Sequence, residues 1–448
     1  MKLIEITSID LTGFHWSWPA KKRAIAKPTR FLLGGLIAML VSACAEPTVE
    51  VSFKTDPASQ SKTTQSSVYG REATFSYPAF SGNHLVASTS MVMTDFARLE
   101  TFESNSIEKR KLQIRFFYPR DAQGYTETPQ RLPVINKISW QYLVGHQELS
   151  GKRLRYSNYE NAFWDVSLDS PISSEQQNYP VLVFSHGYGY NTESYTALLA
   201  ELASKGYIVV AINHSYGANP SDLSSNGLGI LPEIEANNRS SEHFDDSYPA
   251  SSQRRFVWAK PLNYNAVEQY LPIWSDDQSF VIEQLIRLNS DNRSILFQKL
   301  DLANLGLFGH SYGGAAAYHT AARDSRVKAL VDIDGTIFNH GRQTVVQPFA
   351  FIVSNKHQPK FDFSDATGNS YLVRLNRFTH STFTDHVLWW QWDHDDSVKD
   401  LGDVEALTAV EITSELIDDF FARYLLEQPP QWFLSDDIQT ENLTIRRM

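Results

Sequence analysis

Two uninterrupted apolar segments, Val181–Phe184 and Tyr207–Ile212, constrain the fold of this chain more than any other feature. A strand that is apolar at every position is typical of a parallel sheet with both faces covered, because neither face meets water. Between these segments, Ala197–Leu202 is predicted to be a helix, which ends at Gly206. A strand, a helix and a second strand in this order form the unit from which parallel sheets are built.

The same alternation returns further along the chain. An alternating segment at 112–118 predicts an earlier strand that ends at Pro119. Further strands are predicted at 304–309, 327–334 and 349–353, a helix at 315–323, and a closing amphipathic helix around 412–425. We therefore predict an α/β protein with a mostly parallel central sheet, helices on both faces and insertions at the carboxyl edge.

Two stretches interrupt this alternation, at about 126–177 and 217–255. The second is rich in Ser, Asn and Asp and directly follows a buried strand. Long polar connections run over the surface, because a buried loop would leave backbone polar groups without partners. We expect this excursion to lie over the carboxyl edge of the sheet.

The composition excludes several classes of protein. The 448 residues carry 51 Asp and Glu against 40 Lys and Arg, a formal net charge of −11. This acidic balance argues against a nucleic-acid partner, since proteins that bind nucleic acids present basic surfaces. The single cysteine, Cys44, excludes an internal disulfide framework and any metal site made of several cysteines.

The amino-terminal residues have the pattern of a secretory signal. Five basic residues between Lys21 and Arg30 precede an apolar run at 31–43, which is too short to span a hydrocarbon core of about 30 Å as a helix. The run ends in Val-Ser-Ala before Cys44, which resembles the lipobox of bacterial lipoproteins. The resemblance implies that residues 1–43 are removed and that Cys44 is acylated. The alternative is an ordinary cleavable signal with an unmodified cysteine.

This signal also predicts where the protein resides. The acyl chains on Cys44 would hold it to the cell envelope, and in a Gram-negative host the residue Ala45, rather than an aspartate, favours the outer membrane. Residues 44–75, rich in Ser, Thr, Gln and Pro, are predicted to be a flexible tether. Residues 76–448 are predicted to form one catalytic domain.

A motif with chemical meaning follows the predicted strand at 304–309. Gly309-His310-Ser311-Tyr312-Gly313 has the form G-x-S-x-G, and a run of small residues after it opens a helix. A nucleophilic serine on such a sharp strand-to-helix turn is exposed, and the flanking glycines prevent collisions there. Ser311 is therefore the candidate nucleophile.

A second glycine-rich segment follows the buried strand at 181–184. Ser185-His186-Gly187-Tyr188-Gly189 forms a loop that can aim a backbone N–H at a developing oxyanion. We predict that the oxyanion hole consists of the backbone N–H groups of Tyr188 and Tyr312. His186 and His310 are predicted to be structural residues that hold these loops by hydrogen bonds.

Together, these motifs resemble the secreted, plasma-type platelet-activating factor acetylhydrolase family of α/β-hydrolases. The resemblance is carried by Phe-Ser-His-Gly-x-Gly at 184–189, Ala-Ser-Lys-Gly-Tyr-Ile-Val at 203–209 and Gly-His-Ser-Tyr-Gly-Gly at 309–314. It implies an α/β-hydrolase fold and a serine esterase that acts on short-acyl phospholipids or related amphiphilic esters. The chain departs from the animal enzymes at 213–217 and in the excursion that follows.

The resemblance also implies the acid and the base. Asp334 lies on the strand end Val331–Phe338, and His380 precedes a Phe-x-Asp segment that ends at Asp385. The order serine, aspartate, histidine is the order expected of any α/β-hydrolase. From the sequence alone, Asp332 is a rival acid, as are Asp362 and Asp365 one strand later, and His386 is a rival base.

Other signals carry less weight. Trp389, Trp390 and Trp392 could line an acyl pocket, but aromatic residues in such a run are more often core. Asp393-His394-Asp395-Asp396 contains oxygen-rich metal ligands but is more often a solvated loop. We expect neither a metal nor an organic cofactor. A general carboxylesterase or polyester hydrolase is an alternative activity, and a non-catalytic lipid-binding lipoprotein is a rival of another class.

Overall fold

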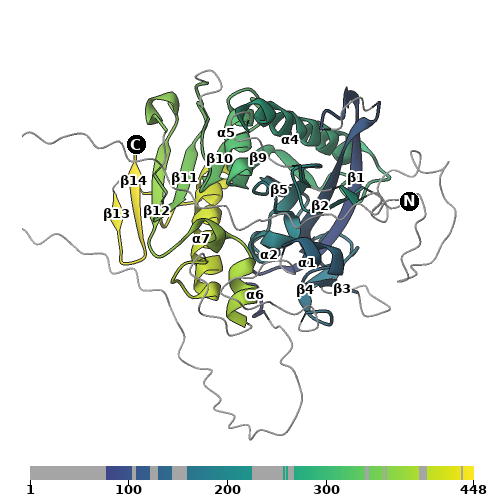
Figure 1. Cartoon of the computed structure of the whole chain (residues 1–448), viewed down its shortest axis with the longest axis horizontal. Coiled ribbons are helices and arrows are strands. Elements are labelled where there is room, and N and C mark those ends of the chain that lie inside the picture. The colour runs from purple at the N-terminus through teal and green to yellow at the C-terminus, as the bar shows by residue number, and fades with distance from the viewer. Residues whose placement is uncertain are drawn as a thin grey trace, which may run out of the picture. The chain divides into compact units, whose positions relative to one another are not determined.

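The described part of the chain holds a small two-stranded sheet, β7 (Ser221–Asp222) with β8 (Phe256–Val257), and a larger mixed sheet of 12 strands (Figure 1). Six parallel strands form its centre: β5 (Tyr179–Ser185), β6 (Ile208–Asn213), β9 (Leu300–His310), β10 (Ala329–Ile333), β11 (Phe349–Ser354) and β12 (Ser370–Leu375). They lie in the order β12-β11-β10-β9-β5-β6. The predicted α/β class with a mostly parallel sheet is confirmed.

The computed structural model describes residues 77–102, 107–121, 130–143, 159–223, 256–257, 259–260, 267–338, 343–355, 357–358, 361–392, 401–434 and 437–448. The predicted signal peptide, Cys44 and the predicted tether lie outside these residues, as do the acidic segment 393–396 and the excursion between 224 and 255. Among the described residues, no helix combines the length and the apolar character needed to cross a membrane.

Antiparallel strands extend the sheet at both ends. Next to β6 lie β2 (Lys109–Arg120) and β1 (Leu85–Leu99), and beyond β12 lie β14 (Leu443–Arg447) and β13 (Ile438–Gln439). The stretch 126–177 is not only an interruption, because it supplies β3 (Arg131–Pro133) and β4 (Phe163–Leu168) to the edge beside β1. The alternation of Trp164 and Val166 with polar residues, which places both in the core, is the sequence signal for β4.

Helices cover both faces of the parallel strands. On one face, α4 (Val267–Ser290) packs on α5 (Tyr312–Ala321), and both contact β9. On the other, α2 (Thr196–Ser204) packs on α7 (Ala406–Leu426), and α7 contacts β9 and α6 (His386–Trp392). The remaining described helix is α1 (Lys137–Leu143), and short 3-10 turns lie at η2 (Thr192–Tyr195), η4 (Phe363–Asp365) and η5 (His380–Phe383).

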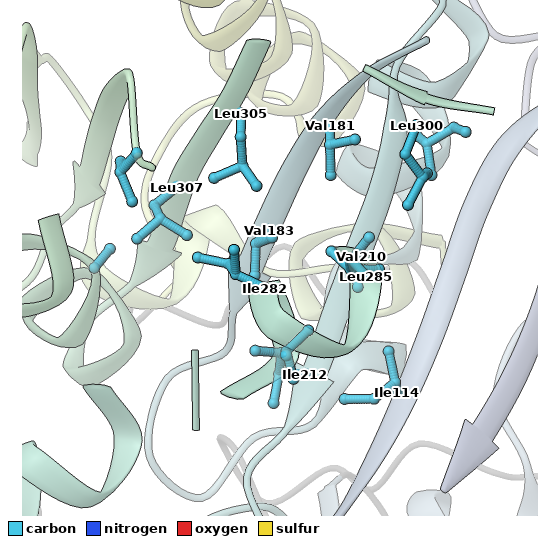
Figure 2. Close-up of a cluster of buried hydrophobic side chains, with 14 of the residues drawn as sticks. Ile114, Val181, Val183, Val210, Ile212, Ile282, Leu285, Leu300, Leu305 and Leu307 are labelled. Carbon is cyan, nitrogen blue, oxygen red and sulfur yellow. The ribbon is translucent and has the colours of Figure 1, made fainter. Parts of the chain in front are cut away.

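Strand β5 shows why every one of its positions is apolar. Val181 and Val183 belong to the cluster that Ile282 and Leu285 of α4 complete (Figure 2). On the opposite face, the side chain of Phe184 packs on Phe308, whose ring contacts a phenylalanine of α7. Both faces of the strand are therefore dry, as its composition predicts.

Helix α4 was not predicted from the sequence, although its signal is present. Leu271, Trp274, Val281, Leu285 and Leu288 recur at helical spacing and are buried. The helix contains Pro272 near its start and many polar residues, which obscure the pattern. Its importance for the site comes from two of its buried residues, Trp274 and Asp277.

Candidate active site

Ser311 occupies the sharp turn between β9 and α5. Its backbone has φ 56° and ψ −120°, a conformation that is uncommon for a residue with a side chain. The Ser311 N–H donates to the Ile333 carbonyl at 2.8 Å, so the turn is fixed to the end of β10. A Cβ on Gly313 would lie 2.2 Å from the Ser185 carbonyl oxygen, and one on Gly309 would lie 2.4 Å from Gly313. Glycine is therefore required at both flanking positions.

Asp334 and His380 lie together beside this turn. The His380 Nδ1 is 2.7 Å from the Asp334 Oδ2. Asp334 is buried, whereas the His380 side chain is 43% exposed, so a molecule from the solvent can meet His380 but not Asp334. Ser354, at the end of β11, also donates its N–H and hydroxyl to Asp334, at 2.7 and 3.2 Å. Sequence reasoning did not identify Ser354.

The charge state of Asp334 follows from these contacts. Burial alone would raise the pKa of its carboxyl group, but the hydrogen bond and charge of His380 outweigh burial, with help from His357 and the Ser354 N–H. The pKa of Asp334 is therefore held below its ordinary value, and the group is a carboxylate at neutral pH.

Ser311 lies within the same small region. The rings of His310 and His380 have centroids 4.4 Å apart, so the residue before Ser311 touches the histidine. The Ser311 carbonyl oxygen would be 2.5 Å from a Cβ on Gly335, the residue after Asp334. The ends of β9 and β10 and the turn η5 thus bring Ser311, Asp334 and His380 together.

The rival acids lie elsewhere. Asp332 is buried under the serine turn, where its Oδ1 accepts from the Gly335 N–H at 2.9 Å, and burial raises its pKa well above the ordinary range. Asp362 is exposed and caps η4 through the Ser364 N–H. Asp365 lies in η4 itself. Within the described residues, the hydrogen-bonded carboxylate partner of His380 is Asp334.

The rival base, His386, is also placed away from Asp334. It begins α6, where it is buried against the rings of Tyr190 and Trp389. Burial lowers its pKa to about 3. Trp389 and Trp390 are fully buried, which matches the expectation that they belong to the core.

The two predicted oxyanion donors, the N–H groups of Tyr188 and Tyr312, belong to segments that meet at the serine turn. Tyr312 N–H is the first in α5, where no carbonyl of the helix can accept from it. Gly187 approaches the serine so closely that a Cβ there would lie 3.2 Å from the Ser311 Cβ. In this loop the N–H groups of Gly187, Gly189 and Tyr190 donate to the Tyr195 hydroxyl, the Gly217 carbonyl and the Gly187 carbonyl. Among the described residues, the Tyr188 N–H has no such acceptor.

The two histidines of the motifs are buried and hydrogen-bonded. His310 Nδ1 is 2.8 Å from the Tyr195 hydroxyl, and His186 Nδ1 is 2.7 Å from the Gly187 carbonyl oxygen. Burial, and then the charge of His380, hold the pKa of His310 well below its ordinary value. Burial likewise lowers the pKa of His186 to about 3.

The segment that carries His380 is joined to the segment after residues 185–189, which we call the oxyanion loop. The hydroxyls of Tyr190 and Ser381 lie 3.4 Å apart. The Asp385 N–H donates to the Ser194 carbonyl at 2.7 Å, and the Asp385 carboxyl group accepts from the Ala197 N–H at 3.2 Å, near the start of α2.

No cluster of three or more metal-ligating side chains occurs among the residues that the structure describes.

A serine turn after a central parallel strand, with an aspartate and a histidine that follow later strands, is typical of the α/β-hydrolase fold, and this chain has that fold. The family model described as "alpha/beta hydrolase fold" matches residues 180–372. The model described as "Platelet-activating factor acetylhydrolase, isoform II" matches residues 69–221, which include the oxyanion loop. The resemblance to that family inferred from the motifs is confirmed.

Individual relatives agree with this assignment. The chain is 26% identical over 287 residues to platelet-activating factor acetylhydrolase of Cavia porcellus, covering 61% of this chain and 63% of the relative. It is 23% identical to that of Gallus gallus (70% and 76% covered) and 22% identical to a probable 1-alkyl-2-acetylglycerophosphocholine esterase of Arthroderma benhamiae (61% and 62%). The match thus spans about three fifths of the length of several of these relatives.

Among solved structures, a ferulic acid esterase from Streptomyces cinnamoneus has a similar fold. The TM-score is 0.61 at 20% identity, and the match covers 82% of this chain and 96% of the esterase.

Proposed function

We propose that this chain is a serine esterase that hydrolyses carboxylic ester bonds. The observation that carries the proposal is the 2.7 Å contact between His380 and the buried Asp334, beside a serine on a strained turn. A nucleophile, a base and an orienting acid in this arrangement form the machinery of acyl transfer.

Each residue then has one task. The Ser311 Oγ attacks the ester carbonyl carbon, and the His380 Nε2 takes the hydroxyl proton and passes it to the leaving alcohol. Asp334 orients the imidazole and stabilises its charged form. Water, activated by His380, then releases the acid from Ser311. These residues carry out every proton transfer and stabilise every charge in the scheme, so the scheme includes no cofactor.

The proposed oxyanion hole stabilises the tetrahedral intermediates. The backbone N–H groups of Tyr188 and Tyr312 would donate to the oxygen that becomes negative when Ser311 attacks. Each such donor contributes about 10²–10³-fold in rate. Both groups are free to do so, because neither has a backbone acceptor among the described residues.

The proposed substrates are short-acyl phospholipids or related amphiphilic esters. The support is the match to the platelet-activating factor acetylhydrolase model and to relatives with that name. Rates on p-nitrophenyl esters of increasing chain length, and on phospholipids with a short or a long sn-2 acyl chain, test this assignment. A preference for long chains, or for polyesters, would replace it with the broader carboxylesterase activity.

Labelling by a fluorophosphonate tests the chemistry itself. We expect the wild-type protein to be labelled and Ser311→Ala to be neither labelled nor active, with an unchanged thermal unfolding temperature. A Ser311→Ala variant that keeps near wild-type turnover, or a wild-type protein that is never labelled, would leave the non-catalytic, lipid-binding rival.

We also propose that acyl chains on Cys44 anchor the enzyme to the cell envelope, at the outer membrane in a Gram-negative host. Cys44→Ser should leave the membrane fraction or remain uncleaved, with the specific activity of the catalytic domain unchanged. Fractionation, together with the mass of the amino-terminal peptide, makes the test. An unmodified Cys44 in a membrane-bound wild-type protein would contradict the proposal.

A further inference from the structure

A buried series of hydrogen bonds connects α4 to the oxyanion loop. Asp277 Oδ2 of α4 lies 2.9 Å from the Nδ1 of His214. The backbone N–H of His214 donates to His186 Nε2 at 3.1 Å, and His186 Nδ1 lies 2.7 Å from the Gly187 carbonyl oxygen. These four residues belong to α4 and to the ends of β6 and β5, so the series crosses the carboxyl edge of the sheet.

The partners of His186 determine which of its nitrogens carries the proton. A carbonyl oxygen can only accept, so the Nδ1 that faces Gly187 carries the hydrogen. A backbone N–H can only donate, so the Nε2 that faces His214 is the bare nitrogen. His186 is therefore neutral with a defined tautomer, and its low pKa, a result of burial, keeps it so at working pH.

The Gly187 carbonyl belongs to the same peptide group as the Tyr188 N–H. In a planar trans peptide, the C=O and the N–H point in opposite directions. Fixing the carbonyl on one side therefore fixes the direction of the N–H on the other. Gly187 itself lies against the serine turn, since a Cβ on it would be 3.2 Å from the Ser311 Cβ. A carbonyl that accepts a hydrogen bond also makes its own N–H a stronger donor, because bonds in series polarise one another.

The far end of the series is held rigidly. Asp277 is paired with Arg110 at 2.6 Å and Arg98 at 2.8 Å, and burial excludes water from the Asp277 and Arg110 pair. The imidazole of His214 stacks on Trp274, with centroids 3.9 Å apart and planes within 8°. The loop that carries His214 therefore has little freedom to shift.

His214 has a third partner, Ser185, but the three residues do not form a second catalytic centre. His214 Nε2 lies 2.9 Å from the Ser185 Oγ, so Ser185, His214 and Asp277 have the contacts of a nucleophilic triad. All three side chains are buried, and the Ser185 Oγ also accepts from Gln278 at 2.8 Å. No ester can reach this serine. The arrangement instead anchors the strand end from which His186 extends.

We propose that His186 is a positioning residue of the oxyanion hole: its Nδ1–H holds the Gly187 carbonyl so that the Tyr188 N–H points at the oxyanion. The proposal rests on the proposed esterase function. The two nitrogens of His186 contact different partners, so the positioning role of His186 can be tested separately from its contribution to folding. Substitutions that keep one contact and remove the other separate the two roles.

The test compares His186→Asn with His186→Gln. The asparagine amide places an N–H near the position of Nδ1 and can still hold Gly187, but it leaves the His214 N–H without an acceptor. The glutamine amide reaches the position of Nε2 and can accept from His214, but it removes the side-chain donor of the Gly187 carbonyl and leaves that carbonyl with the Tyr190 N–H alone among the described residues. His319→Asn and His319→Gln are matched controls at another buried histidine, which lies on α5 about 10 Å from the start of that helix.

We expect activity and stability to separate. His186→Asn should unfold at a lower temperature than wild type but keep kcat on a p-nitrophenyl acetate substrate within about fivefold. His186→Gln should unfold near the wild-type temperature, with kcat about 10²-fold lower and KM changed less than threefold, since an oxyanion donor acts only in the transition state. Affinity for an aryl trifluoromethyl ketone, whose adduct with Ser311 carries the oxyanion, should fall in parallel with kcat.

The opposite pattern would overturn the proposal. If kcat follows the unfolding temperature, so that the asparagine variant loses more than the glutamine variant, His186 acts only through the fold. Failure of both variants to fold, while the His319 controls fold, would assign the same role. Failure of the proposed function appears differently, as an absence of turnover and fluorophosphonate labelling in the wild-type protein.

Discussion

The Nδ1 of His380 lies 2.7 Å from the Oδ2 of Asp334, although 46 positions separate them in the chain. The sheet order explains this closeness. Asp334 follows β10, and its N–H continues the ladder to β11 by donating to Ile352. His380 follows β12, which lies on the other side of β11 in the sheet. Both residues therefore emerge at the same carboxyl edge.

This contact predicts the effect of removing the carboxylate. Asp334→Asn should lower kcat by about 10⁴-fold, because an amide no longer selects the tautomer in which Nδ1 carries the hydrogen. Steady-state kinetics on a short p-nitrophenyl ester measure it. A loss below tenfold would mean that the acid is another residue.

Asp332→Asn is the matched control two residues away. Burial raises the pKa of Asp332 well above its ordinary value and so favours the neutral acid, which an amide of nearly the same shape can replace. We expect kcat to stay within tenfold of wild type. If this variant is as impaired as Asp334→Asn, the two carboxyl groups act as a unit.

Asp385 should make stability depend on pH. Burial raises its pKa to about 8, against an ordinary value of about 3.9. The folded protein therefore retains a proton that the unfolded chain releases. The stability from this group is fully present below about pH 4 and is lost as the pH rises through about 8.

The variant Asp385→Asn should remove this decline. Urea unfolding from pH 4 to pH 9 should show its free energy of unfolding gaining on that of wild type as the pH rises, with the gain levelling off above about pH 8. Asp362→Asn, at an exposed cap, serves as control. A constant difference between Asp385→Asn and wild type at every pH would show that Asp385 is ionised in the fold.

The buried charges around Asp277 predict a large loss of stability. Arg110→Met leaves Asp277 with only the partly exposed Arg98 as its cationic partner, and breaking a buried ion pair from one side costs about 3–5 kcal/mol. Chemical denaturation measures the change. Arg287→Met, which removes an exposed pair with Glu283, should have little effect. Equal effects of the two substitutions would contradict this account.

Gly313 is predicted to tolerate no side chain. In Gly313→Ala the new Cβ would meet the Ser185 carbonyl at 2.2 Å, and a backbone group within a central strand cannot move aside cheaply. We expect loss of fluorophosphonate labelling together with a lower unfolding temperature. Ala315→Gly, two residues further along α5, is the control and should leave labelling intact.

The central strands and the serine turn could be predicted because their signals are local. Continuous apolar runs mark β5 and β6, and the glycines around Ser311 report the crowding at the turn directly. The sequence left several aspartates as candidates for the acid, because it does not show to within two residues where a strand ends. In the structure β10 ends at Ile333, so Asp332 lies within the strand and Asp334 follows it, where it meets His380.

Other parts of the site depend on tertiary contacts that no local pattern encodes. Asp277 is a polar residue on a helix whose apolar stripe was obscured, and its partner His214 lies 63 positions earlier. Ser354 acts on Asp334 only because β11 lies beside β10. The resemblance to a family identified Asp385 as part of a motif, but its contact with the start of α2 explains why an aspartate stands there.

The links between the His380 segment and the residues after the oxyanion loop have a consequence for how the proposed esterase could be altered. Because Tyr190 contacts Ser381, and Asp385 bonds to both Ser194 and Ala197, neither segment can shift without straining the other. Their free energies are thermodynamically coupled, so the cost of loosening either one is shared. Substitutions in the two segments should combine non-additively in a double-mutant cycle, and an engineered change of substrate range in one will select compensating changes in the other.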